Sequence, residues 1–176
     1  VLELGWNDAF IVCDSEDLDA VALAAVKARN SNWGQKCNSS KRIIVTQNNY
    51  EEFKTHFVKH MEAQKIWDPM LADTQMPPLS SKKLVEEIHD QVTRTVDDWG
   101  KILVWGKKIE WIWNFYTPTI LEVDETMTSF KEEVFGPVAS LIKAIDLDDA
   151  VRIANNSDFG LCLSLIHISE PTRRTP

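Results

Sequence analysis

Residues 9 to 46 read AFIVCDSEDLDAVALAAVKARNSNWGQKCNSSKRIIVT, and the order of patterns in this stretch decides the fold class. The apolar run from Ala9 to Cys13 is typical of a buried strand. Asp14-Ser15-Glu16 is a helix start signal, and the following residues keep apolar side chains on one face at helical spacing. Arg42 to Thr46 then has the pattern of a second strand. A strand, a helix and another strand in this order indicate an α/β domain with a mostly parallel sheet.

The rest of the chain continues this alternation. The further helices that we expect share an apolar stripe and cover residues 50–63, 81–98 and 147–156. The further strands are short apolar runs at 101–104, 117–121 and 138–142, and a loop with three prolines covers 67–80. The predicted architecture is a Rossmann-like sheet flanked by helices. No glycine-rich turn follows the first strand, so we expect sequence outside this chain to supply most of any dinucleotide site.

Composition narrows the classes of partner and the cellular compartment. A net charge of −8 argues against a basic face for nucleic acid or an anionic membrane. No apolar run approaches the roughly 20 residues of a membrane helix, and no secretory leader is recognisable. Three cysteines do not make a disulfide framework. We therefore expect a protein of the cytoplasm or an organelle matrix, with no nucleic-acid or membrane partner.

The polar loop from residue 30 to 40 contains the first candidate for chemistry. Cys37 lies among polar residues behind Gly34 and Gln35, whereas buried structural cysteines such as Cys13 usually lie in apolar runs. This context favours a reactive thiol at Cys37. Lys36 beside it either promotes the thiolate through its charge or is an exposed lysine with no such effect.

Three short motifs occur in a fixed order along the chain. They are Glu3-Leu4-Gly5 near the start, Gly34-Gln35-Lys36-Cys37 in the polar loop, and Glu132-Glu133-Val134-Phe135-Gly136-Pro137 far downstream. Together with connecting text such as YTPTIL and ANNSDFGL, they resemble the aldehyde dehydrogenase superfamily over residues 1 to about 161. Within it, the combination looks most like the succinate-semialdehyde dehydrogenase branch. The fold that the resemblance implies is a fragment of an aldehyde-dehydrogenase-like catalytic domain, truncated at both ends.

The resemblance also implies a covalent mechanism and assigns residues to it. Cys37 corresponds to the nucleophile, whose thioester forms as hydride leaves for the nicotinamide of NAD or NADP. Glu3 corresponds to the general base that activates water, and Leu4 lies beside the cofactor. Glu133 corresponds to the carboxylate that holds the ribose hydroxyls, and Phe135 to the aromatic beside the nicotinamide. The family's oxyanion asparagine would lie upstream of this chain.

The implied partner is a small-molecule aldehyde, and the full-length parent would form a homodimer or homotetramer. We expect the fragment by itself to be inactive. The alternative is a non-catalytic oligomerisation or regulatory module that retained the fold. A thiol redox protein is disfavoured because the chain has no C-x-x-C pair. His56 and His60 have the spacing of a zinc pair but lack the intervening glutamate, so we expect no metal site and solvent-facing histidines.

The chain has seven tryptophans and only six glycines, and the positions of the tryptophans depart from the family pattern. Five of the tryptophans stand where the pattern expects glycine, at positions 6, 67, 105, 111 and 113, and Cys162 does the same. Trp33 and Trp99 stand where small or polar residues are usual. One base change converts a GGG glycine codon to tryptophan, so we interpret these positions as sequence errors. The alternative is a genuine aromatic cluster.

The last residues break composition and period with what precedes them. The stretch from Leu163 to Arg173 resembles a translated transposase sequencing adapter. We therefore divide the chain into a catalytic-domain fragment over residues 1–162 and a tail over 163–176 that is not native, and give the tail no functional interpretation. The alternative is a natural C-terminal strand.

Overall fold

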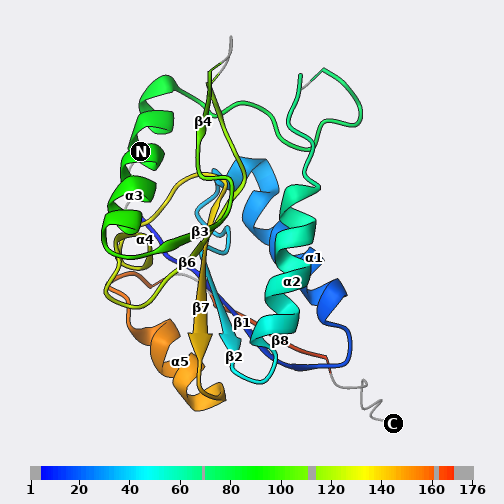
Figure 1. Ribbon diagram of the computed structural model, residues 1–176, viewed down its shortest axis with the longest axis vertical. Helices are drawn as coiled ribbons and strands as arrows, with labels where there is room; N and C mark the ends of the chain where they lie inside the picture. The colour runs from blue at the N-terminus through cyan, green and yellow to red at the C-terminus, as the bar shows by residue number, and fades with distance from the viewer. Residues whose placement is uncertain (1–4, 69, 111–113, 161–162, 169–176) are drawn as a thin grey trace.

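The computed structural model describes residues 5–68, 70–110, 114–160 and 163–168. Its centre is a six-stranded sheet in the order β3-β6-β7-β2-β1-β8 (Figure 1). The strands of this sheet are β1 (Ala9–Ser15), β2 (Arg42–Thr46), β3 (Lys101–Val104), β6 (Thr119–Glu122), β7 (Val138–Ala144) and β8 (Leu163–Ile168). Only the β3–β6 pair is antiparallel among the described strands of this sheet. The predicted α/β class with a mostly parallel sheet is confirmed.

Helices cover both faces of the sheet (Figure 1). On one face lie α1 (Leu18–Asn30) and α2 (Tyr50–Glu62). On the other lie α3 (Lys82–Asp97), the short α4 (Thr128–Lys131) and α5 (Leu147–Asn155). Side chains alternate along β1, so that Phe10 and Val12 enter the core beneath α1 and α2, and Ala9 and Ile11 enter the other core. Two hydrophobic cores therefore enclose the central strands.

Most predicted elements lie within one or two residues of their observed bounds. The start of α1 is an exception, because Asp14 and Ser15 continue β1, and the side chain of Asp17 caps the helix by accepting from the backbone N–H of Ala20. Five elements were not predicted. They are the 3₁₀ turn at Ser31–Gly34, the hairpin of β4 (Lys108–Glu110) and β5 (Asn114–Tyr116), α4, and β8. The first four are too short for a periodic pattern to reveal them.

The strand β8 lies in the segment that we interpreted as a non-native tail. It pairs with β1 in parallel, and Phe10 lies opposite Ser164 in the register. The sheet therefore extends into residues 163–168, beyond the boundary that we assigned at residue 162. A strand pairing does not report on the origin of a sequence, so the adapter interpretation stays a prediction.

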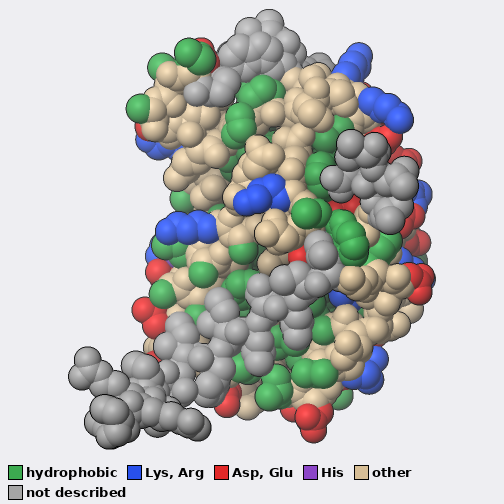
Figure 2. Space-filling view, turned by 180° about the vertical axis from the view of Figure 1, so that it is seen from behind, with side chains coloured by type: hydrophobic (Ala, Val, Ile, Leu, Met, Phe, Trp, Pro, Cys, Tyr) green, Lys and Arg blue, Asp and Glu red, His purple; other side chains and the backbone are tan. Residues whose placement is uncertain are grey.

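One face of the molecule carries charged and apolar side chains in close mixture. On the face shown in Figure 2, lysine and arginine side chains lie scattered among acidic and apolar ones. Within the described residues, no helix combines the length and the apolar character that crossing a membrane requires.

Helix α3 ends in a motif that normally uses glycine. The N–H of Trp99 donates to the carbonyl of Val96 at 3.0 Å, and the N–H of Gly100 donates to that of Thr95 at 2.8 Å. These two bonds define a Schellman motif, in which the residue at Trp99 must adopt a left-handed backbone. Trp99 has φ of 74° and is 87% exposed. The Cβ atom of Trp99 therefore strains the left-handed backbone at the helix end, and the exposed indole adds little burial that could offset this strain.

Trp33 and Trp105 share this conformation, with φ values of 62° and 57°. Glycine is the residue that adopts this region without steric cost. For these three tryptophans the backbone is thus of the glycine type. Trp99 and Trp105 also lie at the surface, whereas Trp33 is fully buried, so the three do not share one buried aromatic cluster. Trp111 and Trp113 lie outside the described residues, as does Cys162.

We expect the substitution Trp99→Gly to stabilise the protein by about 1 kcal/mol, because it removes the left-handed strain of a residue with a side chain. This gain corresponds to a rise in melting temperature of about 2–4 °C for a chain of this size. Trp67→Gly is the matched control, since Trp67 is 53% exposed and is not among the described residues with positive φ. Thermal unfolding followed by circular dichroism measures both. Equal effects of the two substitutions would contradict the assignment of strain to Trp99.

Candidate active site

The loop that carries Cys37 begins where α1 ends. Residues 32–34 have left-handed φ values of 52°, 62° and 71°. This run reverses the chain, and the N–H of Gln35 donates to the carbonyl of Asn32 at 3.0 Å. The side-chain oxygen of Gln35 accepts from the N–H of Ser80 at 2.9 Å. The glutamine of the motif therefore fastens the loop to the segment before α3, and half-buried Cys37 follows two residues later.

Gly34 lets this loop approach the downstream motif closely. A Cβ atom at Gly34 would lie 2.2 Å from the carbonyl oxygen of Gly136, which is far inside van der Waals contact. Only glycine permits this approach, and its φ of 71° also favours glycine. The motif glycine therefore brings the Cys37 loop against the segment Glu132–Pro137.

Glu133 is held from two directions. Its Oε1 lies 2.9 Å from Nζ of Lys41, and its Oε2 accepts from the backbone N–H of Trp6 at 3.0 Å. The side chain of Glu133 is 15% exposed, and its Oε1 is buried. The predicted ribose-binding residue is therefore a preorganised carboxylate rather than a solvated surface acid.

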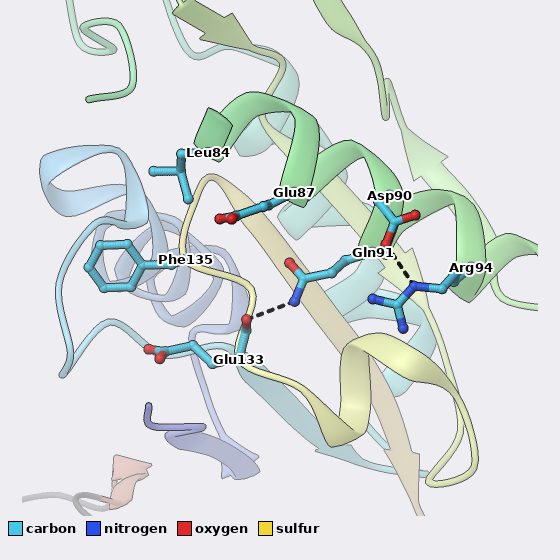
Figure 3. Close-up of a pocket in the computed structure, with 7 residues that line it drawn as sticks. All are labelled: Leu84, Glu87, Asp90, Gln91, Arg94, Glu133 and Phe135. Carbon is cyan, nitrogen blue, oxygen red and sulfur yellow. Dashed lines mark hydrogen bonds and ion pairs between the residues drawn. The ribbon is translucent and has the colours of Figure 1, made fainter. Parts of the chain in front are cut away.

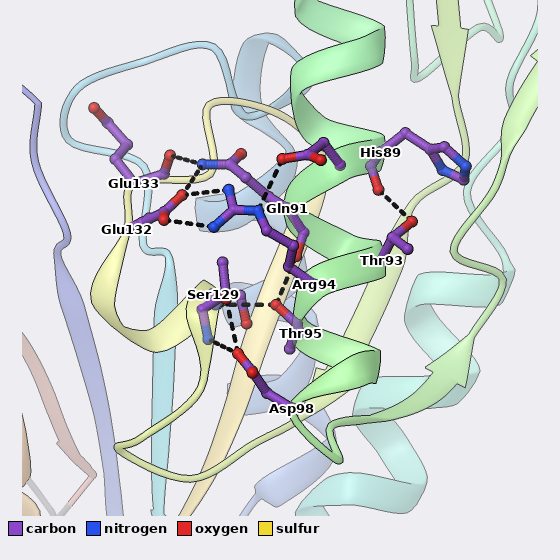
Figure 4. A network of polar contacts seen from close by, with 11 residues as sticks. His89, Gln91, Thr93, Arg94, Thr95, Asp98, Ser129, Glu132 and Glu133 are labelled. Carbon is purple, nitrogen blue, oxygen red and sulfur yellow. Dashed lines mark hydrogen bonds and ion pairs between the residues drawn. The ribbon is translucent and has the colours of Figure 1, made fainter.

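Its neighbour Glu132 has a different environment, which Figure 4 shows. Arg94 of α3 donates to both oxygens of Glu132, at 2.7 and 2.9 Å, and these hydrogen bonds lower the pKa of the carboxyl group. Gln91 of α3 donates to the carbonyl of Glu133 at 3.0 Å and to Oε2 of Glu132 at 3.2 Å. Glu132 therefore fastens the segment to α3.

A pocket of about 200 Å³ lies between α3 and the segment Glu132–Pro137. The residues that line it are Leu84, Glu87, Asp90, Gln91, Arg94, Glu133 and Phe135. In Figure 3, the side chains of Glu133 and Phe135 extend from one loop toward the same side of it. Ligand sites for whole cofactors usually occupy roughly 300–1,000 Å³. The pocket that the described residues form is smaller than this range, so it is too small for a whole dinucleotide. That part of a cofactor site lies here stays a prediction.

Arg29 joins the Cys37 loop to the segment Glu132–Pro137 from within the protein core. It is fully buried at the end of α1, and its guanidinium donates to the carbonyl oxygens of four residues. These acceptors are Ser40 at 3.5 Å, Gly34 at 3.3 Å, Val134 at 2.9 Å and Gly136. Burial lowers the pKa of Arg29 to about 9, because the guanidinium has lost its water. One side chain thus connects the Cys37 loop to the segment of Glu133.

A second buried arginine secures the start of β2. Arg42 donates to the carbonyl oxygens of Asn7 at 2.9 Å, Ile153 at 3.1 Å and Ala154 at 2.9 Å. Its guanidinium carbon also lies 5.1 Å from the centre of the Phe130 ring. These contacts hold the end of α5 and the segment before β1 against the strand that follows the Cys37 loop.

The motif residues lie together at one edge of the sheet. Cys37 precedes β2, and Glu133 and Phe135 precede β7, while the segment Gly5–Asp8 precedes β1. These three strands are adjacent and parallel, so their amino ends meet at the same edge. Glu3 and Leu4, the predicted general base and cofactor neighbour, lie outside the described residues.

Lys41, Arg29 and Gln91 contribute to this region but were not predicted from the sequence. Each has an ordinary local pattern, because Lys41 precedes a strand, Arg29 ends a helix and Gln91 lies within an amphipathic helix. Basic residues are seldom fully buried unless they are paired, so the burial of Arg29 and Lys41 is what marks them as important. That burial is visible only in the structure. Their partners lie far away in the chain, so local patterns do not reveal these contacts.

The expectation of solvent-facing histidines is corrected. His56 Nδ1 and His60 Nε2 lie 2.8 and 3.1 Å from Oδ1 of Asp19 on α1, and their side chains are only 28% and 16% exposed. Lys59 shares the same oxygen at 3.2 Å, and its hydrogen bond is the main cause that lowers the pKa of Asp19. The pair therefore helps to join α1 to α2. Cys13, in contrast, is buried as expected, and burial raises the pKa of its thiol.

The site thus combines a half-buried thiol, a preorganised carboxylate and an aromatic side chain, all at one edge of a parallel sheet. Comparison with known proteins connects this arrangement to a family. The sequence model of the aldehyde dehydrogenase family matches residues 1–169. The NAD(P)+ succinate semialdehyde dehydrogenase of Escherichia coli K12 is 38% identical over 175 residues, which are 99% of this chain and 38% of that relative.

An NADP(+) succinate-semialdehyde dehydrogenase of Mycobacterium tuberculosis H37Rv is 41% identical over 162 residues, which are 92% of this chain and 35% of that protein. Among solved structures, a succinic semialdehyde dehydrogenase from Streptococcus pyogenes in complex with NADP+ is similar with a TM-score of 0.87 and 34% identity, over 93% of this chain and 36% of that one. The chain therefore spans between 35% and 38% of these relatives. From its motifs, its fold and these matches, the chain belongs to the aldehyde dehydrogenase family.

Proposed function

We propose that this chain is part of a longer protein, similar to these relatives in length. That protein oxidises an aldehyde to the carboxylic acid with NAD or NADP, and its substrate is succinate semialdehyde. The names of the similar proteins support the substrate and the cofactor. The observation that carries the proposal is the junction of Cys37 with Glu133 through Lys41, because it places a thiol loop beside a carboxylate at the rim of a pocket.

In this mechanism the Cys37 thiolate adds to the carbonyl carbon of the aldehyde. Loss of hydride from that carbon then leaves a thioester on Cys37, and Glu3 takes a proton from the water that hydrolyses it. A nicotinamide cofactor, when bound, would supply the acceptor for this hydride. Because Cys37 is half-buried, it is partly shielded from solvent but stays accessible to a substrate. The products would be the carboxylic acid and the reduced cofactor, and the Cys37 thiol is regenerated.

The residues present fit a nicotinamide cofactor in part. The Glu133 carboxylate is fixed by Lys41 and the N–H of Trp6, and Glu133 lines the pocket, where a carboxylate would accept from ribose hydroxyls. Phe135 lines the same pocket and offers an aromatic face. The acidic Glu87 and Asp90 make a second part of the wall. Since a pocket of about 200 Å³ is small for a dinucleotide, we expect the 176-residue chain alone to have no dehydrogenase activity.

The proposal is tested first on this chain by alkylation of Cys37 with iodoacetamide. We expect Cys37 to react at least about threefold faster in the folded chain than in the urea-denatured chain, because an activated thiol depends on its folded surroundings. Peptide mass spectrometry separates Cys37 from Cys13, which should react more slowly when folded because it is buried. An equal or slower rate at folded Cys37 would favour the non-catalytic module.

The second test of the proposal uses the full-length protein that contains this chain. We expect it to reduce NAD or NADP with succinate semialdehyde, whereas its Cys37→Ala variant should lose activity by at least about a thousandfold, as removal of a covalent nucleophile does. The absorbance of the reduced nicotinamide measures both. Cys13→Ala is the matched control and should retain activity. Full activity of the Cys37→Ala variant would contradict the proposal.

A further inference from the structure

Lys41 is a buried lysine with an unusual set of contacts. It lies just before β2, its backbone N–H donates to the carbonyl of Asp8 at 3.0 Å, and its side chain is 2% exposed. Its Nζ donates to the carbonyl oxygen of Cys37 at 2.6 Å and to that of Lys36 at 3.3 Å. The same Nζ lies 2.9 Å from Oε1 of Glu133. One ammonium group therefore bridges the nucleophile's own backbone and the carboxylate of the downstream motif.

The charges around this ammonium explain why the bridge holds. Burial lowers the pKa of Lys41, and the nearby Arg29 does the same, while Glu133 and Asp8 oppose them. A buried ammonium is stable only when it is paired and hydrogen-bonded, and Glu133 supplies the pairing charge. The ammonium donates hydrogen bonds to two carbonyl oxygens, and Oε1 of Glu133 is its counter-charge at 2.9 Å. The ammonium that Glu133 pairs with is thus the same group that holds the carbonyl of Cys37.

Arg29 provides an instructive contrast. It also joins the two loops, but all of its described hydrogen bonds go to backbone carbonyl groups, none of them that of Cys37. Arg29 thus fixes the spacing of the loops. Lys41 instead contacts the Glu133 carboxylate directly, so it can respond to what that carboxylate binds.

We infer that Lys41 is a positioning residue that couples the occupancy and charge of Glu133 to the position and reactivity of Cys37. The inference rests on the proposed function, in which Glu133 holds a cofactor's ribose and Cys37 is the nucleophile. A hydroxyl that donates to Glu133 draws electron density from the Lys41 contact, and the ammonium then redistributes its hydrogen bonds toward the carbonyl groups of Cys37 and Lys36. Cofactor binding thereby adjusts the loop that carries the thiol.

A double-mutant cycle on the 176-residue chain tests this coupling. The variants are Lys41→Met, Glu133→Gln and their combination, and the readout is the rate at which iodoacetamide alkylates Cys37. We expect Glu133→Gln to change that rate at least about threefold when Lys41 is present and less than about 1.5-fold when Lys41 is methionine, because coupled residues are non-additive. Lys41→Arg, which keeps the charge and donors, should restore at least part of the effect.

The matched control cycle replaces Lys36 instead of Lys41. Lys36 is adjacent to Cys37 but is exposed, and its Nζ donates to Oγ of Ser31. We expect Lys36→Met and Glu133→Gln to be additive. Additivity in the Lys41 cycle, or equal coupling in both cycles, would overturn the inference.

A second measurement decides the question if Lys41→Met does not fold. Glu133→Gln and Glu132→Gln are compared by the backbone amide NMR signals of Cys37 and Asn38, which flank the carbonyl that Lys41 holds. Glu132 bonds to Arg94 and Gln91 rather than to Lys41. We expect the two signals to move in Glu133→Gln and to stay in Glu132→Gln. Unmoved signals in Glu133→Gln would refute the coupling.

These experiments separate this inference from the proposed function. They measure thiol reactivity and amide signals without substrate or cofactor, whereas the proposed function is judged by aldehyde oxidation in the complete protein. An active dehydrogenase with an additive Lys41 cycle refutes only the coupling. A coupled cycle in a protein with no aldehyde oxidation refutes only the proposed reaction.

Discussion

Replacing Arg29 with methionine will lower the free energy of unfolding by about 3 kcal/mol or more. The guanidinium is fully buried, and its removal leaves carbonyl groups of the Cys37 loop and of the Glu133 segment without their donor. Each buried acceptor that loses its partner costs about 1–3 kcal/mol. Methionine fills part of the space, so the loss reflects hydrogen bonding rather than volume. Urea unfolding followed by circular dichroism measures the change.

The control for this prediction is Lys27→Met on the same helix. Lys27 is exposed near the end of α1, and its replacement should change the free energy of unfolding by no more than about 0.5 kcal/mol. In Arg29→Met, one effect opposes the lost hydrogen bonds, because the variant no longer buries a charge. Burial of the Arg29 guanidinium has a free-energy cost, as its pKa, lowered to about 9, indicates. A loss below about 1 kcal/mol in Arg29→Met would show that this burial cost offsets the hydrogen bonds.

The substitution Gly34→Ala should have a similarly large effect for a steric reason. The new Cβ would lie 2.2 Å from the carbonyl oxygen of Gly136 and 2.5 Å from Nη2 of Arg29, so the two loops must separate. The φ of 71° adds backbone strain. Overpacking costs about 1–3 kcal/mol and the strain a further 1–3 kcal/mol, so we expect a total loss of about 2–6 kcal/mol in unfolding free energy.

Gly160→Ala is the matched control for Gly34→Ala. Among the described residues, a Cβ at Gly160 meets no atom within 4 Å, and the φ of Gly160 is not in the left-handed region. We expect it to be neutral within about 0.5 kcal/mol. Urea unfolding of both variants gives the comparison, and Cys37 alkylation reports whether the thiol loop has moved. A stable Gly34→Ala variant with an unchanged alkylation rate would contradict the close approach of the two loops.

Much of the fold was predictable because its signals are local. The strand at Ala9–Ser15 and the helix at Lys82–Asp97 follow from apolar runs and a helical apolar stripe. The hairpin of β4 and β5 was not predictable, because each strand has only three residues. The left-handed backbone at Trp99 was hidden for another reason. Tryptophan is not the residue that signals a Schellman motif, although the bonds of that motif are present.

The sequence by itself determined the alternation of strands and helices and the identity of the motif residues Cys37, Glu133 and Phe135. These depend on neighbouring residues and on short motifs. Only the tertiary structure decided how the motifs are joined. Arg29 contacts Val134 and Lys41 contacts Glu133 across about a hundred residues, where the two loops meet at the amino ends of β2 and β7. Such contacts arise from the order of strands in the sheet, and no local pattern of residues encodes that order.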